Sequence, residues 1–250
     1  MKSSEDILGF NICQELPQTP ENGKIIINTI NPHSYIIAKK DILFKKAIIA
    51  SNYIIADGFG FVLASKILNK KKIFRITGSD LHKHFLIEAE SKLLKVFYLG
   101  ADEKTLECIK AKVSVEYPSV SVNSYSPPFK NVFSPKDNEK IIKSINKISP
   151  DILFIGMTAP KQEKWEYINS KYLNVKVICS IGAVFDYYSE KIIRPKEIWQ
   201  KAGLEWLIRL IKDPRRLWKR TFKSMPEFVI EIIKYKILSK KYLTIKKKKI

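Results

Sequence analysis

Short apolar runs alternate with amphipathic helical stretches along most of this 250-residue chain. Most of the runs are hydrophobic throughout and end at Gly, Asp, Asn or Ser, which is typical of parallel strands that are covered on both faces. Strands are predicted at residues 24–29, 53–56, 72–76, 95–100, 120–125, 151–156 and 175–180. The pattern therefore predicts an α/β fold, in which helices cover both faces of a mainly parallel sheet.

The pattern changes after about residue 196, where the chain becomes helical, Trp-rich and basic. The net charge is +20, and 18 of the 45 Lys and Arg residues fall in residues 194–250 with only 5 of the 25 Asp and Glu residues. We therefore predict a sheet domain at 1–195 and a basic helical appendage at 196–250. Such a charge favours an anionic partner, namely a nucleic acid, a phospholipid surface or a phosphorylated substrate.

Targeting signals and metal-binding spacings are both missing from the sequence. The N-terminus has no apolar signal region, and no run reaches the roughly 18 apolar residues of a spanning helix. Cys13, Cys108 and Cys179 are scattered, which argues against a zinc site or a disulfide framework. We expect a protein of the reducing cytoplasm that meets a membrane only from its surface.

Three polar residues stand where neighbouring predicted strands end. Asp57 follows the run at 53–56 and precedes Gly58, so its carboxylate is expected at the carboxyl edge of the sheet, where open α/β sheets bind ligands. A partly buried carboxylate there suits a general base. Thr29 and Asn31 end the first strand and offer hydrogen bonds toward the same edge. Helix capping is the alternative interpretation for all three residues.

Arg75, Gln162 and Asp186 are further candidates whose roles the sequence leaves open. Arg75 either anchors a phosphate or pairs with an acid such as Asp80. Gln162 either points at a ligand from the start of a helix or belongs to an ordinary first turn. Asp186 follows Phe185 at a strand end, and the pair suits either a nucleoside or simple packing.

The basic appendage combines arginines with tryptophans. Arg209, Arg216 and Arg220 suit bidentate binding of phosphate, and Trp218 stands among cations as in a membrane interface. The alternative is a solvated basic face whose tryptophans lie in the core.

Taken in order, these segments resemble the WecG/TagA/CpsF glycosyltransferases, family 26 of that enzyme class. The resemblance covers roughly residues 24–220, and the ordered set of segments is more specific than any one of them. The matching segments are Thr29-Ile-Asn31, Ala56-Asp-Gly58, Arg75-Ile-Thr-Gly-Ser-Asp80, Tyr125-Ser-Pro-Pro-Phe129, Pro160-Lys-Gln-Glu-Lys-Trp165, Gly182-Ala-Val-Phe-Asp186, Gly203-Leu-Glu-Trp-Leu-Ile-Arg209 and Pro214-Arg-Arg216.

The resemblance implies a Rossmann-like catalytic domain and an inverting transferase that needs no metal or other cofactor. Its members move an N-acetylmannosamine-type sugar from UDP to N-acetylglucosaminyl-diphospho-undecaprenol, for wall teichoic acid or related surface polymers. The family's C-terminal appendage docks on the membrane and helps to close the site. This chain would then be attached peripherally to the inner face of the cell membrane.

The resemblance also implies a role for each candidate residue. Asp57 would be the base that deprotonates the acceptor hydroxyl, and Thr29 and Asn31 would contact the sugars. Arg75 and Gln162 would line the same pocket. The groups that would meet the nucleotide or the diphosphate are Asp186, Arg209, Arg216 and Arg220.

Other functions remain open from the sequence. The donor could be a different UDP-hexose used in capsule or exopolysaccharide synthesis. A charge of +20 also suits a nucleic-acid-binding α/β protein, although no known nucleic-acid motif stands out. A nucleotide-binding module without catalysis, with Asp57 as a cap, is the third possibility. Departures from the family pattern occur at Met157-Thr158, Ser189 and Pro195-Lys196. The sequence leaves a homo-oligomer open as an alternative to a monomer.

Overall fold

The computed structural model describes residues 3–193, 199, 205–212 and 214–247. Within these residues eight strands form one sheet. The strands are β1 (Ser4–Ile7), β2 (Phe10–Cys13), β3 (Ile25–Ile30), β4 (Tyr53–Ala56), β5 (Lys95–Gly100), β6 (Ser121–Tyr125), β7 (Ile152–Gly156) and β8 (Val177–Ser180). Every pairing is parallel except that of β1 with β2, which confirms the mainly parallel α/β sheet.

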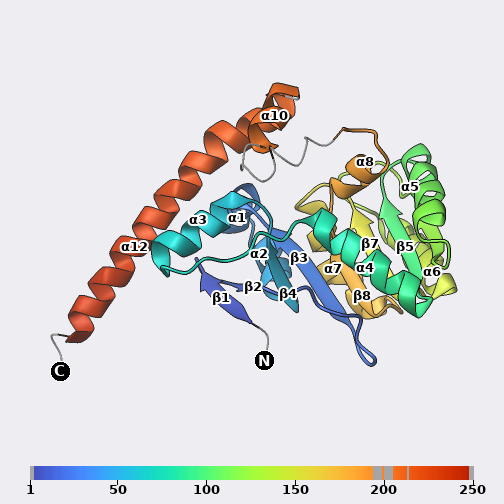
Figure 1. Cartoon of the computed structure of the whole chain (residues 1–250), viewed down its shortest axis with the longest axis horizontal. Helices are drawn as coiled ribbons and strands as arrows, with labels where there is room; N and C mark the ends of the chain where they lie inside the picture. Colours follow the sequence, from blue (N-terminus) through green and yellow to red (C-terminus); the bar gives the residue numbers. More distant parts are fainter. Residues whose placement is uncertain (1–2, 194–198, 200–204, 213, 248–250) are drawn as a thin grey trace.

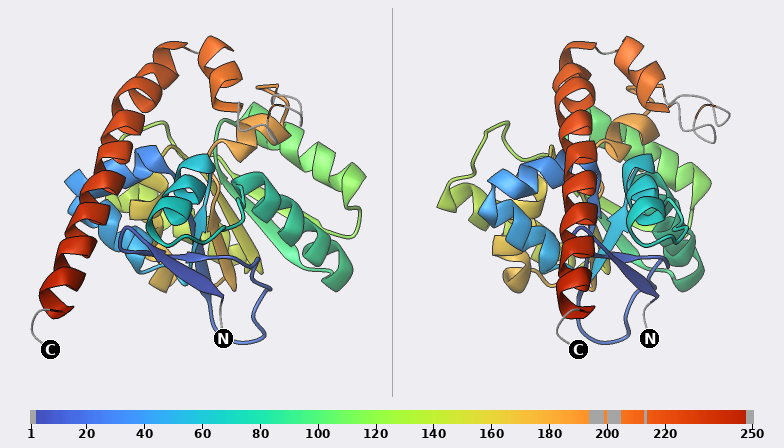
Figure 2. Two further views of the ribbon diagram at one scale, coloured as in Figure 1. Left: turned by 60° about the vertical axis from the view of Figure 1, so that its left-hand side comes forward. Right: turned by 90° about the vertical axis from the view of Figure 1, so that its left-hand side faces the viewer.

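Helices cover the two faces of the sheet (Figure 1 and Figure 2). The first group is α1 (Pro32–Lys40), α2 (Ile42–Ile49), α3 (Phe59–Leu68), α4 (Gly78–Lys92), α5 (Glu103–Glu116), α6 (Pro135–Ile148), α7 (Lys161–Asn169) and α8 (Val184–Tyr188), with a 3-10 turn η1 (Ser170–Tyr172). The C-terminal group is α10 (Glu205–Lys212), α11 (Pro214–Trp218), the π-helical turn η2 (Lys219–Ser224) and α12 (Met225–Lys247). In the right-hand view of Figure 2, α1, α2, α6 and α7 lie on one side of the sheet, and α3, α4 and α5 lie on the other.

The strand order is β1-β2-β4-β3-β8-β7-β5-β6. The hairpin of β1 and β2 is not predicted from the sequence, and it takes the sheet edge beside β4. The prediction of a strand at residues 72–76 is wrong, because the segment 71–77 is irregular. Its backbone bonds to side chains instead: Phe74 N donates to Gln14 Oε1 at 3.0 Å, and Lys71 O accepts from Ser65 Oγ at 3.0 Å.

The sequence pattern over residues 32–50 predicts a single helix, but the structure has two helices, α1 and α2, that meet at Asp41. The Asp41 carboxylate accepts a hydrogen bond from Phe44 N at 3.0 Å, so it caps the start of α2. It also forms an ion pair with Lys164 of α7. A capping carboxylate ends one helix and begins the next, although the apolar pattern continues across it.

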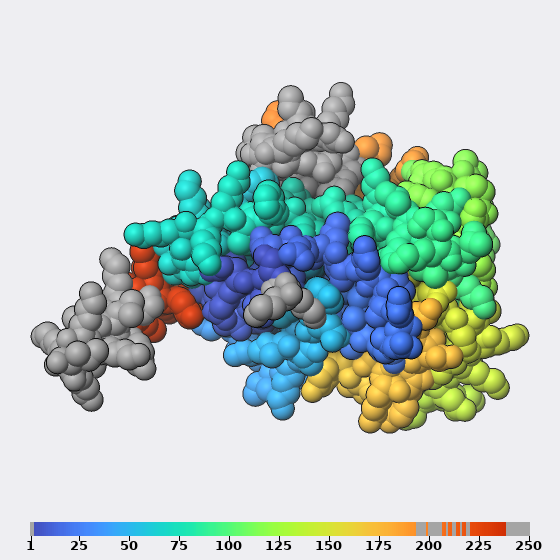
Figure 3. Space-filling model, turned by 60° about the horizontal axis from the view of Figure 1, so that its bottom comes forward, coloured from blue at the N-terminus to red at the C-terminus, as the bar shows by residue number. Residues whose placement is uncertain are grey.

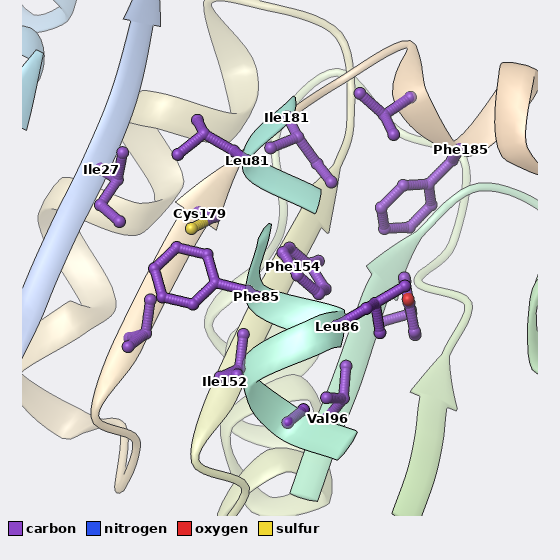
Figure 4. Packing of buried hydrophobic residues seen from close by; sticks show 14 of the residues in the cluster. Ile27, Leu81, Phe85, Leu86, Val96, Ile152, Phe154, Cys179, Ile181 and Phe185 are labelled. Atoms are coloured by element: carbon purple, nitrogen blue, oxygen red, sulfur yellow. The ribbon is translucent and has the colours of Figure 1, made fainter. Parts of the chain in front are cut away.

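Two hydrophobic clusters on opposite faces hold the right-hand half of the sheet together. Figure 4 shows Phe85 and Leu86 of α4 lying over Ile152 and Phe154 of β7 on one face. On the opposite face, Trp165 of α7 belongs to a cluster that α6 also joins. This half of the sheet is therefore covered on both faces by described residues, which leaves the strand ends for ligands.

The C-terminal helix α12 packs at the other end of the sheet, against α1 and α3 (Figure 1). Its residues Phe228 and Ile232 are each 1% exposed. The Phe228 ring centroid lies 5.3 Å from that of Tyr35 in α1 and 5.3 Å from that of Phe61 in α3. These contacts join the start of α12 to the same hydrophobic cluster as the hairpin of β1 and β2.

Candidate active site

Asp57 and Asn31 lie next to each other at the carboxyl edge of the sheet. Ala56 at the end of β4 is the register partner of Ile30 at the end of β3. Asp57 N donates to Ile30 O at 2.9 Å, which ties the two strand ends together. The Asp57 residue is partly buried at this edge, as the sequence predicts. Its place suits a carboxylate that works on a bound ligand.

Thr29 and Asn31 differ in how far their side chains are already engaged. Asn31 caps α1: its Oδ1 accepts from Ser34 N at 3.0 Å, while Asn31 N donates to Ser34 Oγ at 2.8 Å. The capping interpretation of Asn31 is therefore confirmed for its carbonyl oxygen. Thr29 is partly buried and pairs in register with Ile55 of β4. Contacts of both residues with a sugar stay a prediction.

Arg75 lies close to the segment that follows Asp57. Its guanidinium carbon is 5.4 Å from the ring centroid of Phe59, the first residue of α3. Asp80, the acid suggested as a partner of Arg75, accepts from Thr77 N at 2.7 Å and from Thr77 Oγ1 at 2.8 Å, which makes it part of the α4 capping box. Arg75 thus brings a cation toward the end of β4.

Gln162 lies in the first turn of α7 and is 3% exposed. Its Oε1 accepts from Met157 N at 3.1 Å, and its Nε2 donates to Glu163 Oε1 at 2.9 Å. A Cβ added to Gly182, just beyond β8, would lie 3.6 Å from both of these Gln162 atoms. The carboxamide is therefore held beneath the turn that follows β8, at the same sheet edge as Asp57.

Two buried carboxyl groups on α7 are not singled out by the sequence. Burial raises the pKa of Glu163 to about 7 and that of Glu166 to about 8. Asn28 Nδ2 donates to Glu166 Oε2 at 2.8 Å. An acidic residue in the first turn of a helix is normally expected to be ionised and exposed. A signal was nevertheless present, because Glu163 and Glu166 are three residues apart and Asn28 interrupts an apolar strand.

Asp186 lies on α8, which packs against the end of β7. Phe185 is 2% exposed, and a Cβ added to Gly156 would meet its ring at 2.3 Å, so this glycine is required for close packing. A hydrogen bond to Asp102, 2.6 Å long, raises the pKa of Lys191, and the charge of Asp186 contributes to the same shift. Asp186 therefore lies near a cation at the carboxyl end of β8.

The three appendage arginines have a described backbone only. Arg209 lies on α10, Arg216 on α11 and Arg220 on η2, and their side chains are outside the described part of the structure. Trp218 is 59% exposed and stacks on Phe222 with ring centroids 4.4 Å apart. Diphosphate binding by the arginines remains a prediction.

Neither a metal cluster nor a membrane span appears among the described residues. No three His, Cys, Asp or Glu side chains in that part of the chain come together as a metal site. Over the same residues, each helix is too short or too polar to cross a bilayer.

Comparisons with known proteins identify the family of this chain. Residues 11–242 match the family described as Glycosyl transferase WecG/TagA/CpsF. A Bacillus subtilis strain 168 relative is 31% identical over 84% of this chain and 79% of its own length. A relative from Staphylococcus aureus strain MW2 is 30% identical over 87% and 83%, and one from Bacillus spizizenii is 27% identical over 94% and 89%. All three are called N-acetylglucosaminyldiphosphoundecaprenol N-acetyl-beta-D-mannosaminyltransferase. The chain belongs to the WecG/TagA/CpsF family of glycosyltransferases.

Proposed function

We propose that this enzyme moves N-acetylmannosamine from UDP to N-acetylglucosaminyl-diphospho-undecaprenol with inversion at the anomeric carbon. The names of the three relatives support this choice of acceptor and sugar. The observation that carries the proposal is the position of Asp57 at the carboxyl edge, tied to the end of β3 and beside Asn31.

Inversion requires one displacement in which the acceptor oxygen attacks the face of the sugar opposite to UDP. In this proposal the Asp57 carboxylate takes the proton from the acceptor hydroxyl as the new bond forms. The bond from the anomeric carbon to the UDP oxygen breaks, and UDP leaves with the electron pair. Thr29, Asn31 and Gln162 orient the sugars, and Asp186 faces the nucleotide.

The departing diphosphate must be stabilised by positive charge. Arg75 provides one cation near the end of β4, and Arg209, Arg216 and Arg220 are the further candidates from the appendage. Fixed cations and amide dipoles aimed at developing negative charge are an effective form of transition-state stabilisation. We propose that these groups act without a metal ion, so that a chelator leaves the rate unchanged.

We also propose that the C-terminal helices hold the enzyme on the bilayer surface. Large apolar side chains are exposed there beside lysines: Ile211, Trp218, Phe222, Ile230, Ile233, Ile237 and Leu238 are between 50% and 69% exposed. An apolar groove of about 310 Å³ lies between α3 and α12, lined by Leu63, Ile67, Val229, Ile232, Ile233, Lys236 and Ile237. In Figure 3 the red surface of α12 lies beside the teal surface of the α3 region. Apolar side chains mixed with lysines suit the boundary between headgroups and acyl chains.

A panel of UDP-sugars tested against a short-chain lipid-diphosphate N-acetylglucosamine acceptor tests the proposal. We expect UDP release and a β-linked disaccharide-lipid with UDP-N-acetylmannosamine, and release at least about tenfold slower with UDP-N-acetylglucosamine or UDP-glucose, since a site that hydrogen-bonds a substrate group discriminates strongly against analogues that place it differently. A clear preference for another UDP-hexose would replace the donor, and no transfer with any donor would reject the reaction.

A further inference from the structure

A polar pair interrupts an apolar row that crosses the sheet. Ile54, Asn28, Ser180 and Ile155 are successive register partners on β4, β3, β8 and β7. Partners on neighbouring strands point to the same face of a sheet, so all four side chains lie on the face that α7 covers. The hydrogen bond from Asn28 to Glu166 confirms this direction. Asn28 and Ser180 are fully buried, each with an exposed fraction of 0%.

Three buried polar atoms on β3, β8 and α7 have no hydrogen-bond partner among the described residues. They are Asn28 Oδ1, Ser180 Oγ and Glu163 Oε2. Buried polar groups in proteins are almost always satisfied by protein or by an ordered water. Their chemistry is complementary when the Glu163 carboxyl carries its proton on Oε2: the acid O–H donates, the Ser180 hydroxyl accepts and donates, and the Asn28 carbonyl accepts.

The raised pKa of Glu163, about 7, agrees with a carboxyl that is largely protonated at neutral pH or below. Its neighbour Glu166 faces the same buried region, and its pKa of about 8 is raised mainly by burial and further by the charge of Glu163. Both carboxyl groups can therefore be accommodated without a buried pair of negative charges.

The other oxygen of Glu163 is hydrogen-bonded to the carboxamide of Gln162. Gln162 Nε2 donates to Glu163 Oε1 at 2.9 Å, and Met157 N donates to Gln162 Oε1 at 3.1 Å. An amide nitrogen bears two hydrogens. Met157 holds the carbonyl oxygen of the carboxamide and Glu163 holds one amide hydrogen, so the second amide hydrogen is available to a ligand. Without these two contacts, the carboxamide could rotate by half a turn and exchange the positions of its oxygen and nitrogen.

We propose that Glu163 is a positioning residue for sugar transfer, whose carboxyl holds the Gln162 carboxamide so that its second N–H faces the substrate. This inference rests on the proposed function, in which Gln162 contacts the sugar. Glu163 itself touches no substrate in this arrangement. In this proposal Asn28 and Ser180 satisfy the other Glu163 oxygen through a buried water, because none of the three atoms has a hydrogen-bond partner among the described residues.

Kinetics of Glu163 variants alone and combined with Gln162→Ala test the proposal. Glu163→Gln presents a carbonyl to Gln162 and an amide N–H in place of the acid O–H, so we expect kcat/KM within about threefold of the wild type. Glu163→Leu has similar volume and no polar group, so we expect a loss of about tenfold or more, mostly in kcat. In the Gln162→Ala background, Glu163→Leu should have almost no further effect, because its partner is already gone.

Glu166→Leu is the matched control, since Glu166 lies on the same helix, is equally buried, and bonds to Asn28 instead of Gln162. We expect it to lower the thermal unfolding midpoint and to act independently of Gln162→Ala. Should Glu163→Leu not fold, Glu163→Asp replaces it, because the shorter side chain keeps the carboxyl but no longer reaches Gln162. Equal losses for Glu163→Gln and Glu163→Leu, or additive effects with Gln162→Ala, would overturn the proposal.

A second readout separates this inference from the proposed reaction. The side-chain amide resonances of Gln162, identified by their loss in Gln162→Ala, report its hydrogen bonding in a ¹⁵N-labelled protein without turnover. We expect them to be sharp and similar in the wild type and in Glu163→Gln, and shifted or broadened in Glu163→Leu. No sugar transfer by the wild type would reject the reaction, whereas unchanged Gln162 resonances in Glu163→Leu would reject the positioning role.

Discussion

Replacing Phe228 by Ala tests how firmly the C-terminal helix is joined to the catalytic core. Phe228 is 1% exposed, and its ring centroid lies 5.3 Å from that of Tyr35 and 5.3 Å from that of Phe61, which are themselves 6.2 Å apart. Truncating a buried Phe to Ala typically costs about 3–5 kcal/mol, from lost burial and from the cavity that remains. The loss cannot exceed the free energy that holds α12 against α1 and α3, because the helix can detach instead.

Urea unfolding of the Phe228→Ala protein measures this cost. Two isoleucines on the same helix provide a matched pair: Ile232 is 1% exposed and Ile230 is 50% exposed. We expect Ile232→Ala to lose about 2–4 kcal/mol and Ile230→Ala less than about 1 kcal/mol. A Phe228→Ala protein within about 1 kcal/mol of the wild type, or equal losses for the two isoleucines, would show that α12 is not anchored in this way.

Three further predictions follow from the same structure. Burial raises the folded-state pKa of Glu163 to about 7 and that of Glu166 to about 8, so the stability that the two protonated carboxyls contribute is complete below about pH 4.5 and is lost as the pH rises through 7 to 8. Glu166→Gln should reduce this loss in the free energy of unfolding by up to about 3 kcal/mol between pH 5.5 and 8.5, as measured by urea denaturation, and an unchanged pH dependence would contradict the raised pKa. Gly156→Ala places a Cβ 2.3 Å from the Phe185 ring, so it should lower the free energy of unfolding by about 1–3 kcal/mol and weaken UDP binding measured by calorimetry. An unaltered UDP affinity would show that the position of α8 does not affect nucleotide binding. Trp218 is 59% exposed, so Trp218→Glu should reduce co-sedimentation of the protein with anionic liposomes and leave the thermal unfolding midpoint unchanged. Undiminished liposome binding would show that Trp218 is not part of the membrane-docking surface.

The parallel sheet and the placement of Asp57 could be predicted because both follow from local patterns. Apolar runs ended by Gly, Asp or Asn mark the central strands, and the carboxyl ends of parallel strands share one edge. The helix cap at Asn31 also follows from residue type, and Asn31 caps α1 at the edge of the sheet where the ligand is expected. Local patterns are therefore enough to place Asp57 and Asn31 at the carboxyl edge of the sheet.

Other features depend on contacts that no local pattern records. The segment at 72–76 has the composition of a strand, yet β2 already pairs with the free edge of β4. Residues 32–50 keep a helical pattern across Asp41, and the break comes from its capping bond and its ion pair with Lys164. Glu163 is buried because α7 packs on β8 and is hydrogen-bonded to β3 through Asn28 and Glu166, whereas an acidic residue type alone predicts an exposed side chain.

The central claim is that the Asp57 carboxylate deprotonates the acceptor. Its most direct measurement is the rate of sugar transfer by Asp57→Asn and Asp57→Ala, with UDP affinity and the thermal midpoint recorded for each protein. We expect both variants to lose about 100-fold or more in kcat while UDP affinity changes by less than about threefold. Turnover near the wild-type rate in a folded Asp57→Ala protein that binds UDP would contradict the claim.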